Sequence, residues 1–159
     1  MRITFFLLLF ILFSGSIYSQ EDKSPEIQKG VDYHNKEDYK NAFAMFLKAA
    51  NEGNSYAQAR LGIMYINGEG VPENYETAMM WLRKSADNDN YYGKHFVGLM
   101  YEEGWGVTQD YNKAAQWYQK AAEQGYAKAQ KSLGDCYANG NGVNKDLHLA
   151  FKWYQKAAE

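Results

Sequence analysis

Residues 55–90 read SYAQARLGIMYINGEGVPENYETAMMWLRKSADNDN, and the same pattern returns 36 residues later in 91–126 and again in 127–159. Each copy carries a Gly-x-Gly-Val loop, and no insertion separates the loops, which begin at Gly68, Gly104 and Gly140. Identical residues at one fixed spacing indicate internal repeats, each of them a small structural unit. The chain is therefore an array of units and not a single irregular core.

Within one copy, the apolar residues predict two helices. Ala57, Leu61 and Met64 recur at the spacing that places side chains on one face of a helix. Gly68 follows at a point where a helix end favours the left-handed conformation. Asn74 then precedes a second apolar series, and its side chain can accept hydrogen bonds from the free amides of a new helix. The counterparts of Asn74 in the other units are Asp38, Asp110 and Asp146.

One such helix pair cannot bury its apolar face alone, so the pairs must stack on one another. The expected fold class is all-α, an α-solenoid of stacked antiparallel helix pairs. Small residues such as Gly62 and Ala78 let neighbouring helices approach closely.

The repeated pattern is Ala-x3-Leu-Gly-x2-Tyr-x2-Gly-x-Gly-Val-x3-Tyr-x2-Ala-x2-Trp-x3-Ala-Ala, and it resembles the Sel1-like repeat. Residues 55–90, 91–126 and 127–159 carry it, the last copy being shortened at its end. Residues 20–54 contain a short leader and a helix pair that resembles the tetratricopeptide repeat, because its inter-helix turn is shorter. The resemblance implies a superhelix whose first helices line a concave side.

Residues 1–19 form a separate segment with the layout of a secretory signal peptide. Arg2 gives a basic start, residues 3–13 are all apolar, and small polar residues follow. Eleven apolar residues span about 17 Å, too short for a hydrocarbon core of about 30 Å. We expect cleavage after Ser19, with Ser16 as the alternative, and no membrane insertion afterwards. The protein is then exported, and the resemblance favours a bacterial periplasm or secretion.

Composition excludes several classes of function. With 17 basic and 19 acidic residues the formal net charge is −2, which argues against nucleic-acid binding. Cys136 is the single cysteine, so there is no internal disulfide, and we expect it to be buried. The three histidines share no metal-ligand spacing, so no metal or cofactor is expected: His34, His95 and His148.

Catalysis is not expected either. Some Sel1-like proteins carry a β-lactamase label, but that chemistry needs a Ser-x-x-Lys nucleophile and a Lys-Thr-Gly element. Neither motif occurs in this sequence.

The remaining candidate for function is the surface of the first helices. The residues on this surface differ between units: aliphatic residues and a tyrosine come first, aromatic residues follow, and lysines come last. An apolar groove with charged ends suits a peptide segment. The middle unit is rich in aromatic residues, which are enriched at binding hot spots. Packing against the adjacent loop or unit is the alternative for Trp105 and Phe96. The predicted contact residues are Tyr56, Ile63, Tyr92, His95, Phe96, Leu99, Trp105, Lys128 and Lys131.

We therefore predict a noncatalytic adaptor that binds a protein or peptide partner. A cell-wall glycan-binding module is one alternative, and a β-lactamase-like hydrolase is another. The last helix carries Ala150, Trp153 and Ala157, with no polar cap helix after it. The face beyond them is expected to be polar or to be covered by self-association.

Overall fold

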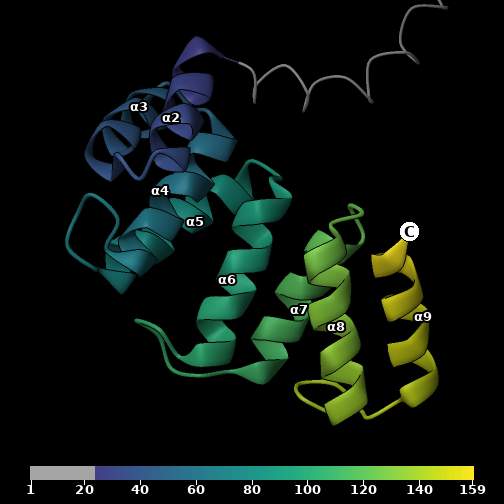
Figure 1. Ribbon diagram of the computed structural model, residues 1–159. Coiled ribbons are helices and arrows are strands. Elements are labelled where there is room, and N and C mark those ends of the chain that lie inside the picture. Colours follow the sequence, from purple (N-terminus) through teal and green to yellow (C-terminus); the bar gives the residue numbers. More distant parts are fainter. Residues whose placement is uncertain (1–23) are drawn as a thin grey trace, which may run out of the picture.

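The computed structural model describes residues 24–159, and the predicted signal peptide lies outside them (Figure 1). The described residues form eight helices and no strands, which confirms the all-α prediction. The helices are α2 (Pro25–Asn35), α3 (Tyr39–Asn51), α4 (Ser55–Asn67), α5 (Tyr75–Asp87), α6 (Tyr91–Glu103), α7 (Tyr111–Ala122), α8 (Ala127–Asn139) and α9 (Leu147–Ala158). Each even-numbered helix pairs with the one that follows it, and the four pairs run in sequence order from α2 to α9 (Figure 1).

Side-chain caps begin most of these helices, as the sequence predicts. The Asn74 side chain accepts a hydrogen bond from the Thr77 amide at 2.8 Å, which starts α5. Its three aspartate counterparts cap the other second helices in the same way: Asp38, Asp110 and Asp146. Among the described helices α8 is the exception, because its N-cap residue is Tyr126, which makes no side-chain cap hydrogen bond.

Inside each pair, a glycine of the first helix makes room for a large side chain of the second. A Cβ atom at Gly98 would lie 2.7 Å from the Tyr118 ring, and one at Gly134 would lie 2.6 Å from the Tyr154 ring. The other two pairs repeat the arrangement, with Gly30 against Phe46 and Gly62 against Leu82. The close approach predicted for these glycines is confirmed.

Between pairs, each long loop rests on the start of the second helix of the preceding unit. Gly70 has φ +74°, and a Cβ there would lie 2.5 Å from the Tyr39 carbonyl oxygen. Gly106 faces Tyr75 and Gly142 faces Tyr111 at the matching positions. The loops thus fix the register between neighbouring units.

Apolar packing joins the pairs into one array. Phe46 on α3 and Leu61 and Met64 on α4 belong to one fully buried cluster, which Trp81 of α5 also enters. Two further clusters continue the packing toward α9. No helix within residues 24–159 is long and apolar enough to cross a membrane.

Candidate functional site

Helices α4, α6 and α8 place seven of the nine predicted contact residues in matching rows. We call this the first-helix surface. One row holds Tyr56, Tyr92 and Lys128, the next holds His95 and Lys131, and the third holds Ile63 and Leu99. The two tyrosines, Ile63 and Leu99 are half-buried, while both lysines are exposed. The surface therefore changes from apolar on α4 and α6 to charged on α8.

Four tyrosines at the starts of α4, α6 and α8 form a continuous aromatic group on this surface, which we call the tyrosine cluster. Its members are Tyr56, Tyr91, Tyr92 and Tyr126. The Tyr92 ring centroid lies 5.6 Å from that of Tyr56, 4.8 Å from Tyr91 and 5.1 Å from Tyr126. Tyr91 and Tyr126 are 5.0 Å apart. These spacings lie in the range of favourable aromatic contacts.

Sequence reasoning missed Tyr126. Its counterparts are Asn54 and Asn90, whose side chains cap α4 and α6. A tyrosine in place of a capping asparagine costs about 1 kcal/mol of helix stability. The missing cap at position 126 could have identified Tyr126 from the sequence, because proteins depart from local stability rules chiefly at functional sites.

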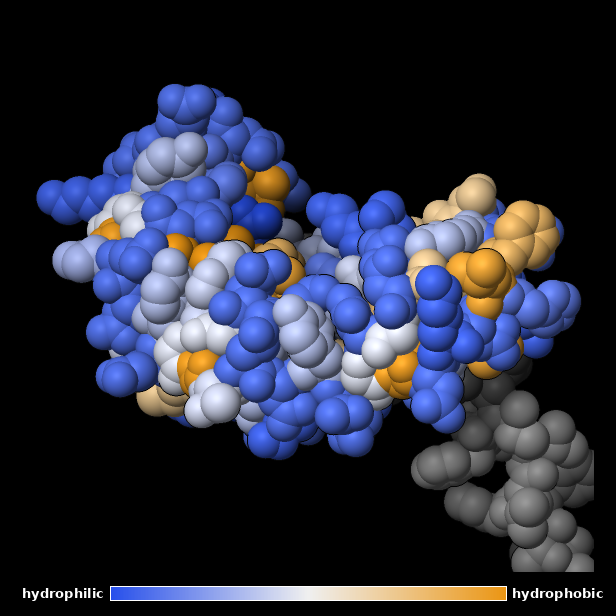
Figure 2. All heavy atoms as spheres, turned by 90° about the horizontal axis from the view of Figure 1, so that it is seen from below, coloured by the Kyte–Doolittle hydropathy of each residue, from blue (hydrophilic) through white to orange (hydrophobic). Residues whose placement is uncertain are grey.

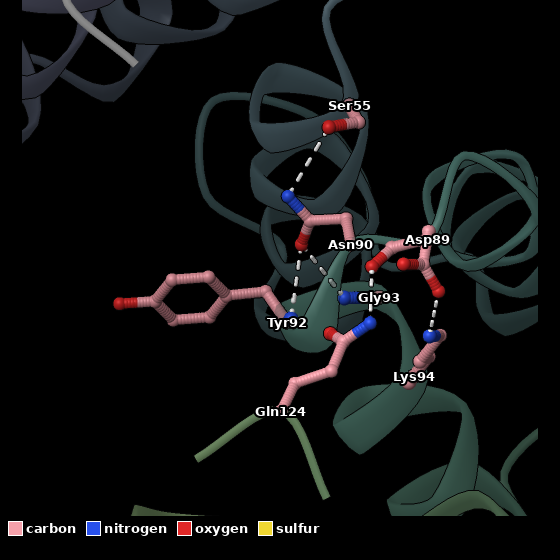
Figure 3. Close-up of polar contacts among 7 residues, drawn as sticks. All are labelled: Ser55, Asp89, Asn90, Tyr92, Gly93, Lys94 and Gln124. Carbon is pink, nitrogen blue, oxygen red and sulfur yellow. Dashed lines mark hydrogen bonds and ion pairs between the residues drawn. The ribbon is translucent and has the colours of Figure 1, made fainter. Parts of the chain in front are cut away.

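The junction before α6 fixes the backbone of Tyr92 (Figure 3). The Asn90 side-chain oxygen accepts hydrogen bonds from the Tyr92 amide at 2.9 Å and the Gly93 amide at 3.3 Å. Its amide nitrogen donates to Ser55 Oγ in the preceding unit at 3.2 Å. The Tyr92 ring points away from this polar group in Figure 3. The position of the ring is thus tied to two units.

The same junction contains a pair of coupled departures from the repeat. Asp89, with φ +61°, stands where other units have glycine. It forms an ion pair with Lys94, whose side chain is only 10% exposed. Lys94 stands where the other units have glutamines that donate to a backbone carbonyl, namely Gln58 and Gln130. The carbonyl of Asp89 in turn accepts from Gln124 at 3.0 Å (Figure 3).

His95 lies beneath the tyrosine cluster and is 8% exposed. Its ring is 5.3 Å from Tyr126 and 5.4 Å from both Tyr118 and Phe96. Its Nδ1 atom has no hydrogen-bond partner within the described part of the chain. Burial, and secondly the charge of Lys128, lower the pKa of His95 to about 4. The imidazole is therefore neutral at pH 7 and supports the cluster from below.

The two remaining predicted contact residues pack against their neighbours. Trp105 stacks on Tyr75 of the preceding unit, with ring centroids 5.8 Å apart and planes at 10°. Phe96 is half-buried and packs against the apolar cluster that contains Leu82 and Val97. Both are half-buried, so part of each ring stays open to solvent.

The charged end of the surface is held in place. Lys131 forms an ion pair with Asp135 at 2.9 Å, one turn further along α8. The Tyr154 hydroxyl donates to the other Asp135 oxygen at 2.8 Å, so α9 also fixes this carboxylate.

Cys136 is buried, as predicted, and burial followed by the charge of Glu102 raises the pKa of its thiol to about 12. A thiol with so high a pKa is a poor nucleophile at neutral pH. Residues 24–159 hold no group of three or more His, Cys, Asp and Glu side chains that could bind a metal ion.

Four stacked helix pairs with a ring-rich first-helix surface define a helical-repeat protein. The Sel1 repeat family model matches residues 27–54, 55–90, 92–126 and 127–159, and the chain belongs to this family. The match includes residues 27–54, the unit whose short turn resembles the tetratricopeptide repeat. Sel1 repeats are generally protein-interaction modules.

Solved structures show the same fold. A Sel1 repeat protein from Oxalobacter formigenes is 37% identical, with a TM-score of 0.76 over 82% of this chain and 54% of that one. The protective antigen c5321 of uropathogenic Escherichia coli, described as having an SLR fold, is 37% identical, with a TM-score of 0.76 over 89% of this chain and 32% of its own. Helicobacter pylori cysteine rich protein B (hcpB) is 25% identical, with a TM-score of 0.61 over 86% of this chain and 91% of its own.

The chain thus spans 54% of the Oxalobacter protein and 32% of the Escherichia coli protein. No curated protein matches it.

Proposed function

We propose that this protein is an exported, noncatalytic adaptor that binds a segment of a partner protein on its first-helix surface. The observation that carries the proposal is the tyrosine cluster, which joins the starts of α4, α6 and α8 and includes a residue that replaces a helix cap. Tyrosine rings supply large contact areas with few torsions to restrict, which is why they are frequent at binding hot spots.

The neighbouring residues support a peptide ligand. Ile63 and Leu99 continue the apolar surface beside the cluster, and exposed Lys128 closes it with positive charge, while Lys131 is already paired with Asp135. A segment that combines apolar side chains with an acidic end would complement both parts. Neutral His95 adds no charge beneath the rings at pH 7.

The experiment compares partner capture by the immobilised wild type and by Tyr92→Ala. Envelope extract of the source cell supplies the partners. Met80→Ala is the matched control, since Met80 is 47% exposed on a second helix, away from the cluster. A protein that the wild type and Met80→Ala retain, and that Tyr92→Ala loses, supports the adaptor. Retention of cell-wall fragments without any protein would overturn it in favour of a glycan-binding module.

Two further variants separate binding from packing. Phe96→Ala and Trp105→Ala each remove a half-buried ring that contacts the neighbouring unit. If both lower stability and leave capture unchanged, these rings pack and do not bind. Turnover of a β-lactam that survives purification would contradict the noncatalytic assignment.

Self-association is a second part of the proposal. Leu147 is 66% exposed and Phe151 is 60% exposed on α9, and Figure 2 shows hydrophobic side chains at that end of the molecule. Ala115 at the place of Phe151 is buried, because α8 covers α7 there. Sedimentation at several concentrations tests the idea, and a mass that stays monomeric at all of them excludes it.

A further inference from the structure

The start of each second helix carries one ring or apolar side chain that the next loop can cover. At the second unit, Trp105 from the following loop stacks on Tyr75. At the first unit, His34 packs edge-on against Tyr39 at 5.2 Å, and Glu69 of the following loop bonds to His34 at 2.9 Å. Both tyrosines are half-buried as a result.

The third unit lacks such a cover. The residue in the place of Trp105 is Asn141, and no ring within the described residues stacks on Tyr111. Tyr111 is 39% exposed and is among the few large hydrophobic side chains that are open to solvent.

The Tyr111 ring is nevertheless held in one position. Gln109 Nε2 donates to the Tyr111 hydroxyl at 3.0 Å and to the Glu102 carbonyl at 2.7 Å. Glu73 stands at the place of Gln109 beside Tyr75, where it raises the pKa of the Tyr75 hydroxyl, second to burial. Tyr111 is therefore held by Gln109 and is not covered, whereas Tyr75 is covered by Trp105. A ring fixed before binding loses little conformational entropy when a ligand stacks on it.

An open groove of about 720 Å³ lies at this place. Gln109, Asp110, Tyr111, Asn112, Val143 and Asn144 line it, together with glycines of the loop between α8 and α9. Figure 2 views the molecule from below, the side on which this loop lies in Figure 1, and much of that face is hydrophilic. Side-chain amides of Asn112 and Asn144 make no hydrogen bond within the described residues.

We propose that this groove, the Tyr111 groove, binds one sugar ring of a neutral glycan stacked on Tyr111. A sugar presents a face of C–H groups to an aromatic ring and hydroxyls around its edge. Each hydroxyl both donates and accepts, so it can satisfy the N–H and the C=O of an asparagine amide. An indole has one donor and no acceptor, so it can replace fewer of the hydrogen bonds that these amides make with water.

Charge points to a neutral ligand. Asp110 is the one ionised side chain among the residues that line the groove, and it already accepts from the Lys113 amide at 3.0 Å. The Lys113 ammonium lies 3.1 Å from its other oxygen. The carboxylate is thus compensated, and neither an anion nor a cation has an unpaired counter-charge here.

The test is titration of the protein, produced from the full chain, with neutral tetrasaccharides of N-acetylglucosamine, glucose and mannose. Saturation-transfer NMR and calorimetry measure binding. We expect at least one of them to bind, Tyr111→Ala to weaken that affinity about tenfold or more, and Tyr111→Phe to keep it within about threefold. Asn141→Trp places on Tyr111 the same residue that covers Tyr75, so it should abolish binding without unfolding the protein.

Tyr92→Ala should leave sugar binding unchanged, which separates this proposal from the adaptor surface. Absence of binding by all three sugars would overturn the proposal. So would binding that survives both Tyr111→Ala and Asn141→Trp. A tryptophan-containing peptide that binds this groove when the sugars do not would also overturn it, in favour of a protein contact.

Discussion

The contact between each loop and the preceding helix can be measured with one pair of glycine substitutions. Gly53 and Gly70 both have positive φ, at +97° and +74°, so alanine at either position carries the backbone strain of the left-handed region. Nothing lies within 4 Å of a Cβ at Gly53, whereas a Cβ at Gly70 would meet the Tyr39 carbonyl oxygen at 2.5 Å and its carbon at 2.7 Å. Only Gly70→Ala therefore adds a clash.

The expected magnitudes follow from this difference. Gly53→Ala should cost about 1 kcal/mol, partly offset by the smaller entropy of the unfolded chain. Gly70→Ala should cost about 2 kcal/mol more, because the neighbouring atoms are backbone and cannot move aside without shifting α3. For a chain of this size that is a further fall of roughly 4–8 °C in Tm.

The assay is urea and thermal unfolding of both variants, followed by circular dichroism. Asp89 occupies the position of Gly53 one 36-residue period later, with φ +61°, so a side chain there is compatible with the fold. Equal losses in the two variants would refute the reasoning, since they would mean that the loop does not press on α3.

Three further results are expected. The pKa of His95 is lowered to about 4, so between pH 7 and 5 the unfolded chain takes up a proton that the folded chain does not. The free energy of unfolding therefore decreases as the pH is lowered from 7 to 5. Between pH 7 and 5 the free energy of unfolding, measured in urea, should fall by about 2 kcal/mol more for the wild type than for His95→Phe. Parallel plots of this free energy against pH for the two proteins would contradict the prediction. Asp89→Gly alone should destabilise by leaving the Lys94 ammonium buried without a partner, and adding Lys94→Gln should restore stability; no recovery would disprove the coupling. Cys136 should react with Ellman's reagent at pH 8 only after unfolding, and rapid labelling of the native protein would show that its thiol is accessible.

Much of the fold follows from the sequence because its determinants lie close together along the chain. Caps such as Asn74 bond to an amide three residues away, and Gly68 ends α4 through its own φ of +69°. The 36-residue period then extends each local prediction to the other units. The burial of Cys136 follows in the same way from its place among packing residues.

The candidate site was less predictable because its residues meet across units. Helical spacing indicated the direction of His95 from α6, but not that Tyr126 at the start of α8 packs edge-on against it. The cluster contacts of Tyr126 come from a residue outside the predicted helices, at a cap position where aromatic side chains are unusual. Asp89 and Lys94 each differ from the residue at the same position of the other units, and from the sequence the two differences look independent. The ion pair between them shows that they are linked.

The seam between one loop and the helix before it uses the same positions in each unit: Gly70 on Tyr39, Gly106 on Tyr75 and Gly142 on Tyr111. A gene segment that encodes 36 residues could be duplicated or deleted by unequal recombination and still leave each new boundary with a matching seam. Changes in length by whole periods would therefore preserve these contacts, while an insertion of a few codons inside a loop would misplace the glycine. The residue at the loop position of Trp105, which is tryptophan in one unit and asparagine in the next, would be copied with its segment and could diverge there.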